Sequence, residues 1–335
     1  ATVIGALLGT ASLTSLNPVE SGTLTVLKET ELVVLFLMVC RYVRARSVAA
    51  RMLGTLCLGG ALLASLVILE LLAFERGGIV PPKQYHLMGE IFGFTASLSA
   101  GRLLFGSPPK QSGVFFGSCL ILGTAGVLVS GEAAAFIGAV VAVGLLAFVA
   151  WHRPSVTASR RTLLVGGITA TAVVAVVLTS IPSARRIVSN QLLDLVSVLW
   201  GEPRNSVQAR FSNWRQRIPG VLTRRPLIGF GQMAIPPGWL DNEYFQRLYY
   251  TGLLGFGAYL YMLSVAVRTA LGTVRRDVTG LVGGYAGVVG VMIGAGLAKG
   301  VFHSTKSSAF FVMCSALVFV LVHRDGFNRD ESIRS

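Results

Sequence analysis

The residues best suited to chemistry lie in one polar stretch, from Ser183 to Arg247, set between long apolar runs. Arginines far outnumber acidic residues in this stretch. The arginines are Arg185, Arg186, Arg204, Arg210, Arg215, Arg217, Arg224, Arg225 and Arg247, and the acids are Asp194, Glu202, Asp241 and Glu243. Because the planar guanidinium of arginine holds a phosphate with two parallel hydrogen bonds, this stretch is suited to binding anions.

One segment of this stretch, from Ser206 to Leu222, is expected to form an amphipathic helix interrupted near Pro219. Helical spacing puts Arg210, Trp214 and Arg217 on one face of it. Such a face suits a phosphate held by the arginines with a sugar ring stacked on the tryptophan. The alternative is an interfacial helix whose tryptophan lies at the level of the lipid headgroups and whose arginines contact anionic lipid.

A glycine-containing turn follows this helix. Arg224 and Arg225 precede Pro226, and the sequence Gly229-Phe230-Gly231 comes next. Glycines permit turns with positive φ that expose backbone N–H groups, and we expect these groups to face an anion. Gly-x-Gly alone is a weak signal.

The carboxylates Asp241 and Glu243, with Asn242 between them, open the helix that follows the polar stretch. One interpretation is an ordinary helix N-cap, a position that favours Asp and Asn. The functional interpretation is a carboxylate held beside the arginines, where it accepts a proton from a sugar hydroxyl. Asp241 is the first candidate for this base and Glu243 the second.

The composition predicts the setting of this chemistry. The chain has 335 residues, of which 53% are hydrophobic and 13% charged. Soluble domains carry about 25% charged residues, so the chain is expected to be a polytopic membrane protein. Its net charge of +14 fits the excess of arginine in cytoplasmic loops, so no nucleic-acid partner is expected. The four cysteines have no Cys-x-x-Cys spacing and predict neither a disulfide framework nor a metal site.

Apolar runs of membrane length predict an all-α fold with about ten transmembrane helices. The division is into N-terminal spans (1–182), a long arginine-rich external loop with amphipathic helices (183–247), and C-terminal spans with a tail (248–335). The expected spans are Thr2–Leu16, Glu31–Val43 (extending backwards), Met52–Phe74, Met88–Leu104, Val114–Val129, Ala133–Trp151, Thr162–Ile181, Leu248–Val267, Gly280–Val301 and Ala309–Val322.

The distribution of basic residues predicts the orientation. Arginines are concentrated in the connections after the second, sixth and eighth spans and in the C-terminal tail. Counting the spans puts all four of these segments on the same side of the membrane. The positive-inside rule therefore puts both termini in the cytoplasm and the long loop outside, in a cytoplasmic (cell) membrane. Long loops are largely exempt from that rule, so the arginines of the loop need another explanation.

Ionisable residues are rare within membrane spans because they are costly there, and they usually indicate a functional site. Glu70, Glu90, Glu132 and Lys299 all fall near the outer ends of their predicted helices, which predicts a hydrated external cavity. The alternative for each is snorkelling to the interface or a buried ion pair. Glycines at spacing i, i+4 in the span from Gly280 predict close helix packing without chemistry.

Sequence motifs in the loop resemble the C-terminal half of the O-antigen ligase/polymerase superfamily, over roughly Gly113 to Leu260. The matching runs are ARFSNWRQRIPGVLTRRPLIGFGQ, DNEYFQRLYYTGLLGFGAYLYML and, upstream, GTAGVLVSGEAAAFIGAVVA. The family pattern has an arginine shortly before a tryptophan, a Pro-Leu-x-Gly-x-Gly turn, a short polar signature, and a helix with Gly-Leu-x-Gly. In this chain Glu132 stands where many members carry Arg or Gly.

This resemblance implies a metal-independent membrane glycosyltransferase of the GT-C type, with an external active site, no cofactor, and polyprenyl-diphosphate-linked glycans as donors. Arg210, Asp241 and Glu243 would be catalytic. The substrate-binding residues would be Arg217, Arg224, Arg225, Trp214, Asn242, Glu132 and Lys299. Partners would be a glycan acceptor, membrane lipid, and a polysaccharide flippase or chain-length regulator.

Two other functions stay open. Ligases of the family usually place a histidine where Asp241 and Asn242 stand, so a polymerase of repeat units is favoured over a ligase. His303, at an expected external helix end, is a substitute candidate. A transporter of lipid-linked glycan or polysaccharide belongs to another class, and it would use the arginines to guide its anionic substrate. Transporters often contain internal repeats, and none is found here.

Overall fold

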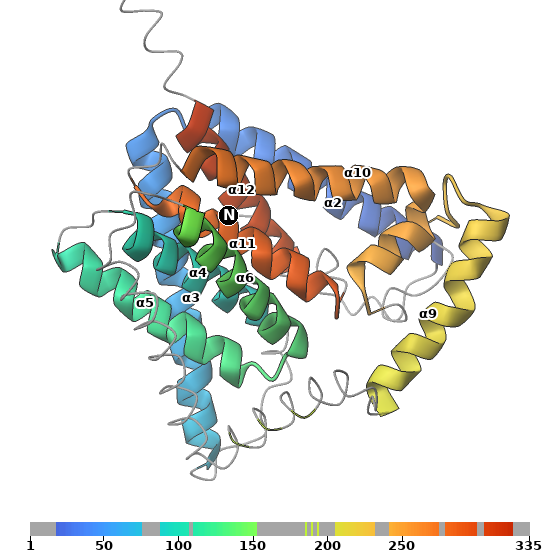
Figure 1. Cartoon of the computed structure of the whole chain (residues 1–335), viewed down its shortest axis with the longest axis horizontal. Coiled ribbons are helices and arrows are strands. Elements are labelled where there is room, and N and C mark those ends of the chain that lie inside the picture. Colours follow the sequence, from blue (N-terminus) through green and yellow to red (C-terminus); the bar gives the residue numbers. More distant parts are fainter. Residues whose placement is uncertain are drawn as a thin grey trace, which may run out of the picture.

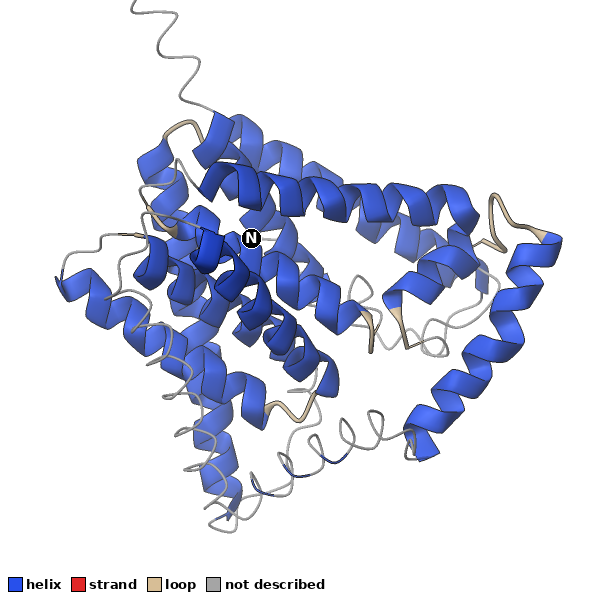
Figure 2. Ribbon diagram, in the orientation of Figure 1, coloured by secondary structure: helices blue, strands red, loops and turns tan. Residues whose placement is uncertain are grey.

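The structure, a computed structural model, describes residues 18–75, 88–106, 110–152, 205–231, 241–274, 279–299 and 305–323, with the single positions 185, 189 and 193. In the described residues, helices are joined by short turns and loops, and no strand is present (Figure 2). The helices are α2 (Pro18–Tyr42), α3 (Arg46–Glu75), α4 (Gly89–Phe105), α5 (Lys110–Val129), α6 (Ala133–His152), α9 (Asn205–Arg224), α10 (Glu243–Val274), α11 (Leu281–Gly296) and α12 (Thr305–His323).

Five of the described helices contain segments long and apolar enough to cross a membrane, which makes the chain an α-helical, membrane-embedded protein. These segments are Arg46–Leu71, Gln111–Val129, Ala133–Trp151, Glu243–Gly272 and Lys306–His323. Large apolar side chains remain exposed along α2, α3 and α10, among them Leu37, Leu62 and Tyr261. Exposed apolar surface of this kind is expected where helices face lipid.

The helices expected between residues 31 and 151, and those expected from 248 to 322, are present. The helix predicted from Glu31 does extend backwards, to Pro18. The spans expected at 2–16 and 162–181 lie outside the described residues, so the number of ten spans, the three-part division and the external position of the loop stay predictions. Helix α10 already begins at Glu243, inside the segment assigned to the loop.

Helix α11 is the centre of the bundle, packed between α4 and α6 (Figure 1). Its glycines make this possible, because a Cβ at Gly284 would lie 2.8 Å from the Cα of Leu98, and one at Gly290 would lie 2.6 Å from the Cα of Ala142. The backbones therefore approach more closely than any side chain permits. The expectation that glycines of this span serve packing is confirmed for Gly287, Gly290 and Gly294, where an added Cβ would lie 2.7, 2.6 and 2.7 Å from atoms of α4 or α6.

Helix α10 is interrupted at Gly252, whose φ of 64° and ψ of −164° are not helical. The short first part of α10 turns away from the long second part at this point (Figure 1). The interruption prevents the N–H groups of Leu253 and Leu254 from bonding to the carbonyls of Tyr249 and Tyr250. Four backbone groups of a membrane-length helix thus need partners from elsewhere.

The turn after α9, residues 226–231, supplies all four partners. A Cβ at Gly252 would lie 2.4 Å from the carbonyl of Leu227, so the turn fits only against a glycine. The four bonds are Phe230 N–H to Tyr249 O (2.9 Å), Gly231 N–H to Tyr250 O (3.0 Å), Leu253 N–H to Pro226 O (2.7 Å) and Leu254 N–H to Leu227 O (3.2 Å). The turn therefore completes α10 and fixes the C-terminal end of α9 to it.

Helix α9 runs without interruption through Pro219, so the interruption expected there is wrong. A proline inside a helix removes one hydrogen bond and clashes with the preceding turn, at a cost of about 3 kcal/mol. Here the inner face of α9 packs against α10 through Trp214, Ile218 and Val221, the last fully buried. This packing holds the helix together on both sides of the exposed Pro219.

Candidate functional site

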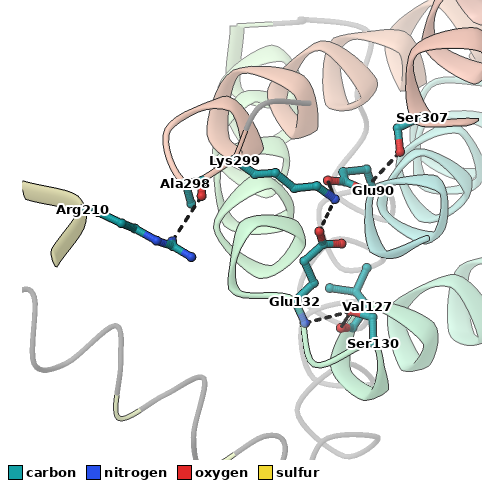
Figure 3. Close-up of polar contacts among 8 residues, drawn as sticks. All are labelled: Glu90, Val127, Ser130, Glu132, Arg210, Ala298, Lys299 and Ser307. Atoms are coloured by element: carbon teal, nitrogen blue, oxygen red, sulfur yellow. Dashed lines mark hydrogen bonds and ion pairs between the residues drawn. The ribbon is translucent and has the colours of Figure 1, made fainter. Parts of the chain in front are cut away.

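Two polar groups lie next to each other at one end of the bundle, where α4, α6, α10 and α12 begin and α11 ends. Figure 3 shows Arg210 of the first group beside Lys299, Glu90, Glu132 and Ser307 of the second. The first, which we name the Arg210 site, consists of Arg210, Asp241 and Asn242. The second, the Lys299 cluster, consists of Lys299, Glu90, Glu132 and Ser307. Residues in or next to six helices, α4, α6, α9, α10, α11 and α12, thus meet at this end.

The Arg210 site is centred on an ion pair between α9 and the start of α10. The Nε of Arg210 lies 3.2 Å from Oδ2 of Asp241, and the two side chains are 37% and 40% exposed. The Nη1 of Arg210 also donates to the carbonyl of Ala298, at 3.3 Å. An exposed ion pair contributes only about 0–1 kcal/mol to stability, so an incoming anion can replace Asp241 at little cost.

Asn242 is the N-cap of α10. Its Oδ1 accepts a hydrogen bond from the N–H of Phe245 at 3.0 Å, and its Nδ2 donates to the carbonyl of Leu297 at 2.7 Å. The side chain is buried. The N-cap alternative is therefore confirmed for Asn242, which also ties the start of α10 to the end of α11. Its role in substrate binding stays a prediction.

The two candidate bases occupy different environments. Glu243 is 1% exposed and its Oε1 lies 2.7 Å from Nε of Arg247, which in turn pairs with Glu29 of α2 at 2.6 Å. Asp241 is much more exposed and faces Arg210. Of the two carboxylates, only Asp241 is placed where a substrate can reach it without breaking a buried ion pair.

The predicted common face of Arg210, Trp214 and Arg217 exists and is turned towards α10. The Trp214 ring packs on Phe245 with centroids 4.8 Å apart, and Arg217 lies near the side chain of Tyr250. Trp214 therefore holds α9 against α10. This contact explains the position of the two arginines, while stacking of Trp214 on a sugar stays a prediction.

Arg224 and Arg225 do not join the Arg210 site. They are exposed at the opposite end of α9. With a rise of 1.5 Å per residue, the fourteen residues from Arg210 to Arg224 span about 20 Å. One diphosphate cannot bridge that distance, so these two arginines do not complete a clamp with Arg210.

The glycine turn does not offer its N–H groups to an anion, contrary to expectation. Gly229 donates to the carbonyl of Arg225 at 3.0 Å, and Phe230 and Gly231 donate to α10. The physical reason is the interruption of α10, whose carbonyls take these donors. The signal missed in the sequence is Gly252, twenty-one residues downstream of Gly231.

The Lys299 cluster is a buried ion cluster. Nζ of Lys299 contacts Oε1 of Glu132 and lies 3.2 Å from Oε1 of Glu90, while the hydroxyl of Ser307 donates to the other oxygen of Glu90 at 3.1 Å. Glu90 is fully buried and the Lys299 side chain is 21% exposed. The predicted convergence of Glu90, Glu132 and Lys299 is confirmed, and it takes the form of the ion-pair alternative. Glu70 is exposed on α3.

Two carboxylates share one ammonium group in this cluster. Burial raises the pKa of Glu132 to about 8, the neighbouring Glu90 adds to the shift, and Lys299 opposes it. The ammonium group of Lys299 lies between the two carboxylates and is the cation that the structure shows in contact with both.

The three residues at the end of α11 join the two polar groups. Asn242 bonds to the carbonyl of Leu297. Arg210 bonds to the carbonyl of Ala298, and the side chain of Lys299 reaches Glu90 and Glu132 (Figure 3). The Lys299 cluster therefore fixes the backbone on which Arg210 rests. A direct role of Glu132 and Lys299 in substrate binding stays a prediction.

The fold and the site define an α-helical membrane protein with an exposed arginine–aspartate pair at one end of its bundle. No protein-family model matches the chain, and a search of the curated proteins finds no match. In the part of the chain that the structure describes, no group of three or more His, Cys, Asp or Glu side chains is placed to hold a metal ion. His303 lies outside that part.

Proposed function

We propose that the protein is a membrane glycosyltransferase that polymerises polyprenyl-diphosphate-linked oligosaccharide repeat units on the external face of the cytoplasmic membrane. The observation that carries the proposal is the exposed ion pair between Arg210 and Asp241. The guanidinium of Arg210 and the carboxylate of Asp241 are 3.2 Å apart, and both side chains are more than a third exposed. In glycosyl transfer from a diphosphate, a cation can stabilise the leaving group and a carboxylate can accept the proton of the acceptor hydroxyl.

The chemistry follows from exchange of partners at Arg210. The donor diphosphate binds the guanidinium and displaces Asp241, whose freed carboxylate accepts the proton of the acceptor hydroxyl. The hydroxyl oxygen forms a bond to the anomeric carbon as the bond from that carbon to the diphosphate oxygen breaks. The diphosphate leaves with the electron pair, and Arg210, with Arg217 from the same face of α9, stabilises its growing charge.

The arrangement of basic residues supports an external site. The α2–α3 connection, with Arg44 and Arg46, lies at the opposite end of the bundle from the Arg210 site, as does Arg102, which donates to the carbonyl of Thr279. Basic residues gather on the cytoplasmic side of membrane proteins. The Arg210 site would then face outwards, towards lipid-linked glycans exported across the membrane.

A transporter of lipid-linked glycan is the second candidate, and the interrupted helix α10 favours it. Transporters bind substrates where interrupted helices leave backbone groups open. The four backbone groups freed by the interruption in α10 are bonded to the 226–231 turn instead. Because these four backbone groups already have partners, they are not open to a substrate, and this observation favours the enzyme over the transporter.

The test is incubation of the purified protein with a polyprenyl-diphosphate oligosaccharide, followed by separation of products by size. A ladder of longer products supports the polymerase, and Asp241→Asn should abolish it. A single transfer to a lipid or protein acceptor would make the protein an O-antigen-type ligase. Movement of the donor across a vesicle membrane without any product would overturn the enzyme in favour of the transporter.

A further inference from the structure

One side of α9, next to the face that packs on α10, carries an apolar stripe, and we call this side the outer face. The ring of Phe211 lies against that of Trp214, with centroids 5.0 Å apart, at the border between the two faces. Phe211 and Leu222 are 43% and 46% exposed, and Arg215 lies between them on the same side at helical spacing. The stripe continues into the turn after α9, where Leu227 and Ile228 are 59% and 67% exposed. Four large apolar side chains therefore form one outer surface along α9 and its turn.

The charge of this surface has one sign. Residues 205–231 contain five arginines and no acidic residue. Two of the five, Arg210 and Arg217, belong to the inner face. The other three, Arg215, Arg224 and Arg225, are exposed. Arg215 lies on the apolar stripe itself, and Arg224 and Arg225 lie at the C-terminal end of α9, next to the exposed Leu227 and Ile228 in sequence. Exposed apolar side chains flanked by cations are typical of helices that lie in a membrane interface.

This surface is continuous with the apolar surface of a membrane-length helix. Leu254, 64% exposed on α10, donates its N–H to the carbonyl of Leu227, and the neighbouring Leu253 is 46% exposed. Leu253 and Leu254 belong to a segment long and apolar enough to cross a membrane. The turn and α9 therefore adjoin the level at which α10 leaves the lipid.

We propose that the outer face of α9 and its turn is a docking surface for an anionic phospholipid bilayer. Phe211, Leu222, Leu227 and Ile228 lie among the upper acyl chains, and Arg215, Arg224 and Arg225 bind the phosphates of anionic lipids. This proposal does not depend on the proposed enzymatic function. It divides the arginines between two partners: Arg210 and Arg217 meet Asp241 and α10, whereas Arg215 on the stripe and the exposed Arg224 and Arg225 at the C-terminal end of α9 meet the membrane.

A physical consequence is that the membrane surface fixes the height of Arg210. Because α9 is one uninterrupted helix, a membrane that holds its outer face also holds its inner face. The anionic group that Arg210 meets must then lie at headgroup level. The docking surface thus selects ligands whose charge is attached to a lipid.

The test uses nitroxide spin labels on single cysteines in the full chain, with Cys40, Cys57, Cys119 and Cys314 replaced by serine or alanine. Labels at Phe211, Leu222 and Ile228 probe the outer stripe. Labels at Ser212 and Gln216, exposed on the side of α9 opposite α10, are the matched controls. Power saturation with oxygen and with a water-soluble nickel chelate measures depth in nanodiscs of phosphatidylcholine with one quarter phosphatidylglycerol.

We expect the stripe labels to be more accessible to oxygen than to the nickel chelate, and the control labels to show the reverse. Stripe labels with the same chelate accessibility as Gln216 would overturn the docking surface. Strong dipolar coupling between stripe labels of two molecules would also overturn it, because the surface would then be an interface between copies of this chain.

The cations are tested separately with the Ile228 label. In discs without phosphatidylglycerol this label should lie closer to water, with nickel accessibility at least twofold higher. The combined change Arg215→Gln, Arg224→Gln and Arg225→Gln should abolish the difference between the two discs, while lysine at all three positions should keep it. A lipid-dependent difference that survives in the glutamine variant would show that these arginines do not bind the anionic lipid.

Discussion

Arg210 and Asp241 hold each other in an exposed ion pair, and the geometry of the arginine matters more than its charge. We expect Arg210→Lys to lower turnover of the lipid-linked donor by roughly a hundred- to a thousand-fold, equivalent to about 2.7–4 kcal/mol of transition-state stabilisation. Lysine keeps the charge but lacks the planar fork that holds a phosphate with two bonds. Product formation from the purified variant is the measurement.

The control for this variant is monodispersity in detergent, which shows that the protein remains folded. If Arg210 served only to hold α9 near anionic headgroups, lysine would replace it with little loss, because that attraction depends mainly on net charge. Near-normal turnover would therefore remove Arg210 from the active site.

Glu132 makes the stability of the protein depend on pH. Its pKa of about 8 in the folded protein lies above its ordinary value of 4.5, so the folded state holds a proton that the unfolded chain has lost. This contribution to stability is fully present below pH 4.5 and is lost as the pH rises towards 8. We expect the thermal denaturation midpoint to fall over that range, by an amount that reflects roughly 1.4 kcal/mol per pKa unit.

Glu132→Gln isolates this contribution, because glutamine keeps the shape of the protonated acid without the ionisation. The decline of the denaturation midpoint between pH 5 and 8 should become shallower in this variant. An unchanged decline would assign the pH dependence to other groups.

The interruption of α10 depends on one glycine, Gly252. Gly252→Ala puts a Cβ at a φ of 64° and 2.4 Å from the Leu227 carbonyl, so we expect a loss of at least about 1–2 kcal/mol of stability and displacement of the 226–231 turn. The control is Gly257→Ala in the same helix, where a Cβ meets nothing within 4 Å.

Gly257→Ala should stabilise the helix by about 0.5–1 kcal/mol, since alanine is the better helix former. Denaturation midpoints of both variants in detergent are the measurement. Equal effects of the two changes would mean that the turn does not depend on Gly252.

The helices themselves could be predicted, because a membrane-length helix carries its signal in one continuous apolar run. The long runs that contain α3, α5, α6 and α12 are examples. The interruption at Gly252 could not, since an isolated glycine in an apolar run is common and its partners, residues 226–231, are remote in sequence. The continuity of α9 through Pro219 was also not predicted, because it depends on packing against α10, which is remote in sequence. This packing outweighs the local tendency of proline to interrupt a helix.

The candidate site was predictable in part. Glu90, Glu132 and Lys299 fall near the outer ends of three predicted helices. This similar depth was enough to predict that they lie at the same end of the bundle. The position of Asp241 beside the arginines was predicted from the charges in one stretch, but the sequence did not indicate which arginine would pair with it. The bonds to Leu297 and Ala298 involve backbone carbonyls, which leave no trace in residue type, so sequence reasoning could not find them.

For the whole molecule, the orientation in the membrane decides whether the site meets exported glycans. We expect a cysteine at Asn205 to react with an impermeant thiol reagent in intact cells, because the basic connections lie at the opposite end of the bundle. A cysteine at Ala45, between α2 and α3, should react only after permeabilisation. The reverse pattern would place the Arg210 site in the cytoplasm and exclude the proposed external reaction.

The bonds between the 226–231 turn and α10 also determine where the chain can be lengthened. Gly231 is fixed to Tyr250, and Asp241 and Asn242 are fixed to Arg210 and Leu297, so both ends of segment 232–240 are held independently of what joins them. Lengthening a connection whose ends are already placed costs only about 0.6 kcal/mol per doubling. An epitope tag inserted within this segment would therefore leave helix α9 in place, giving a handle on the same side as the Arg210 site.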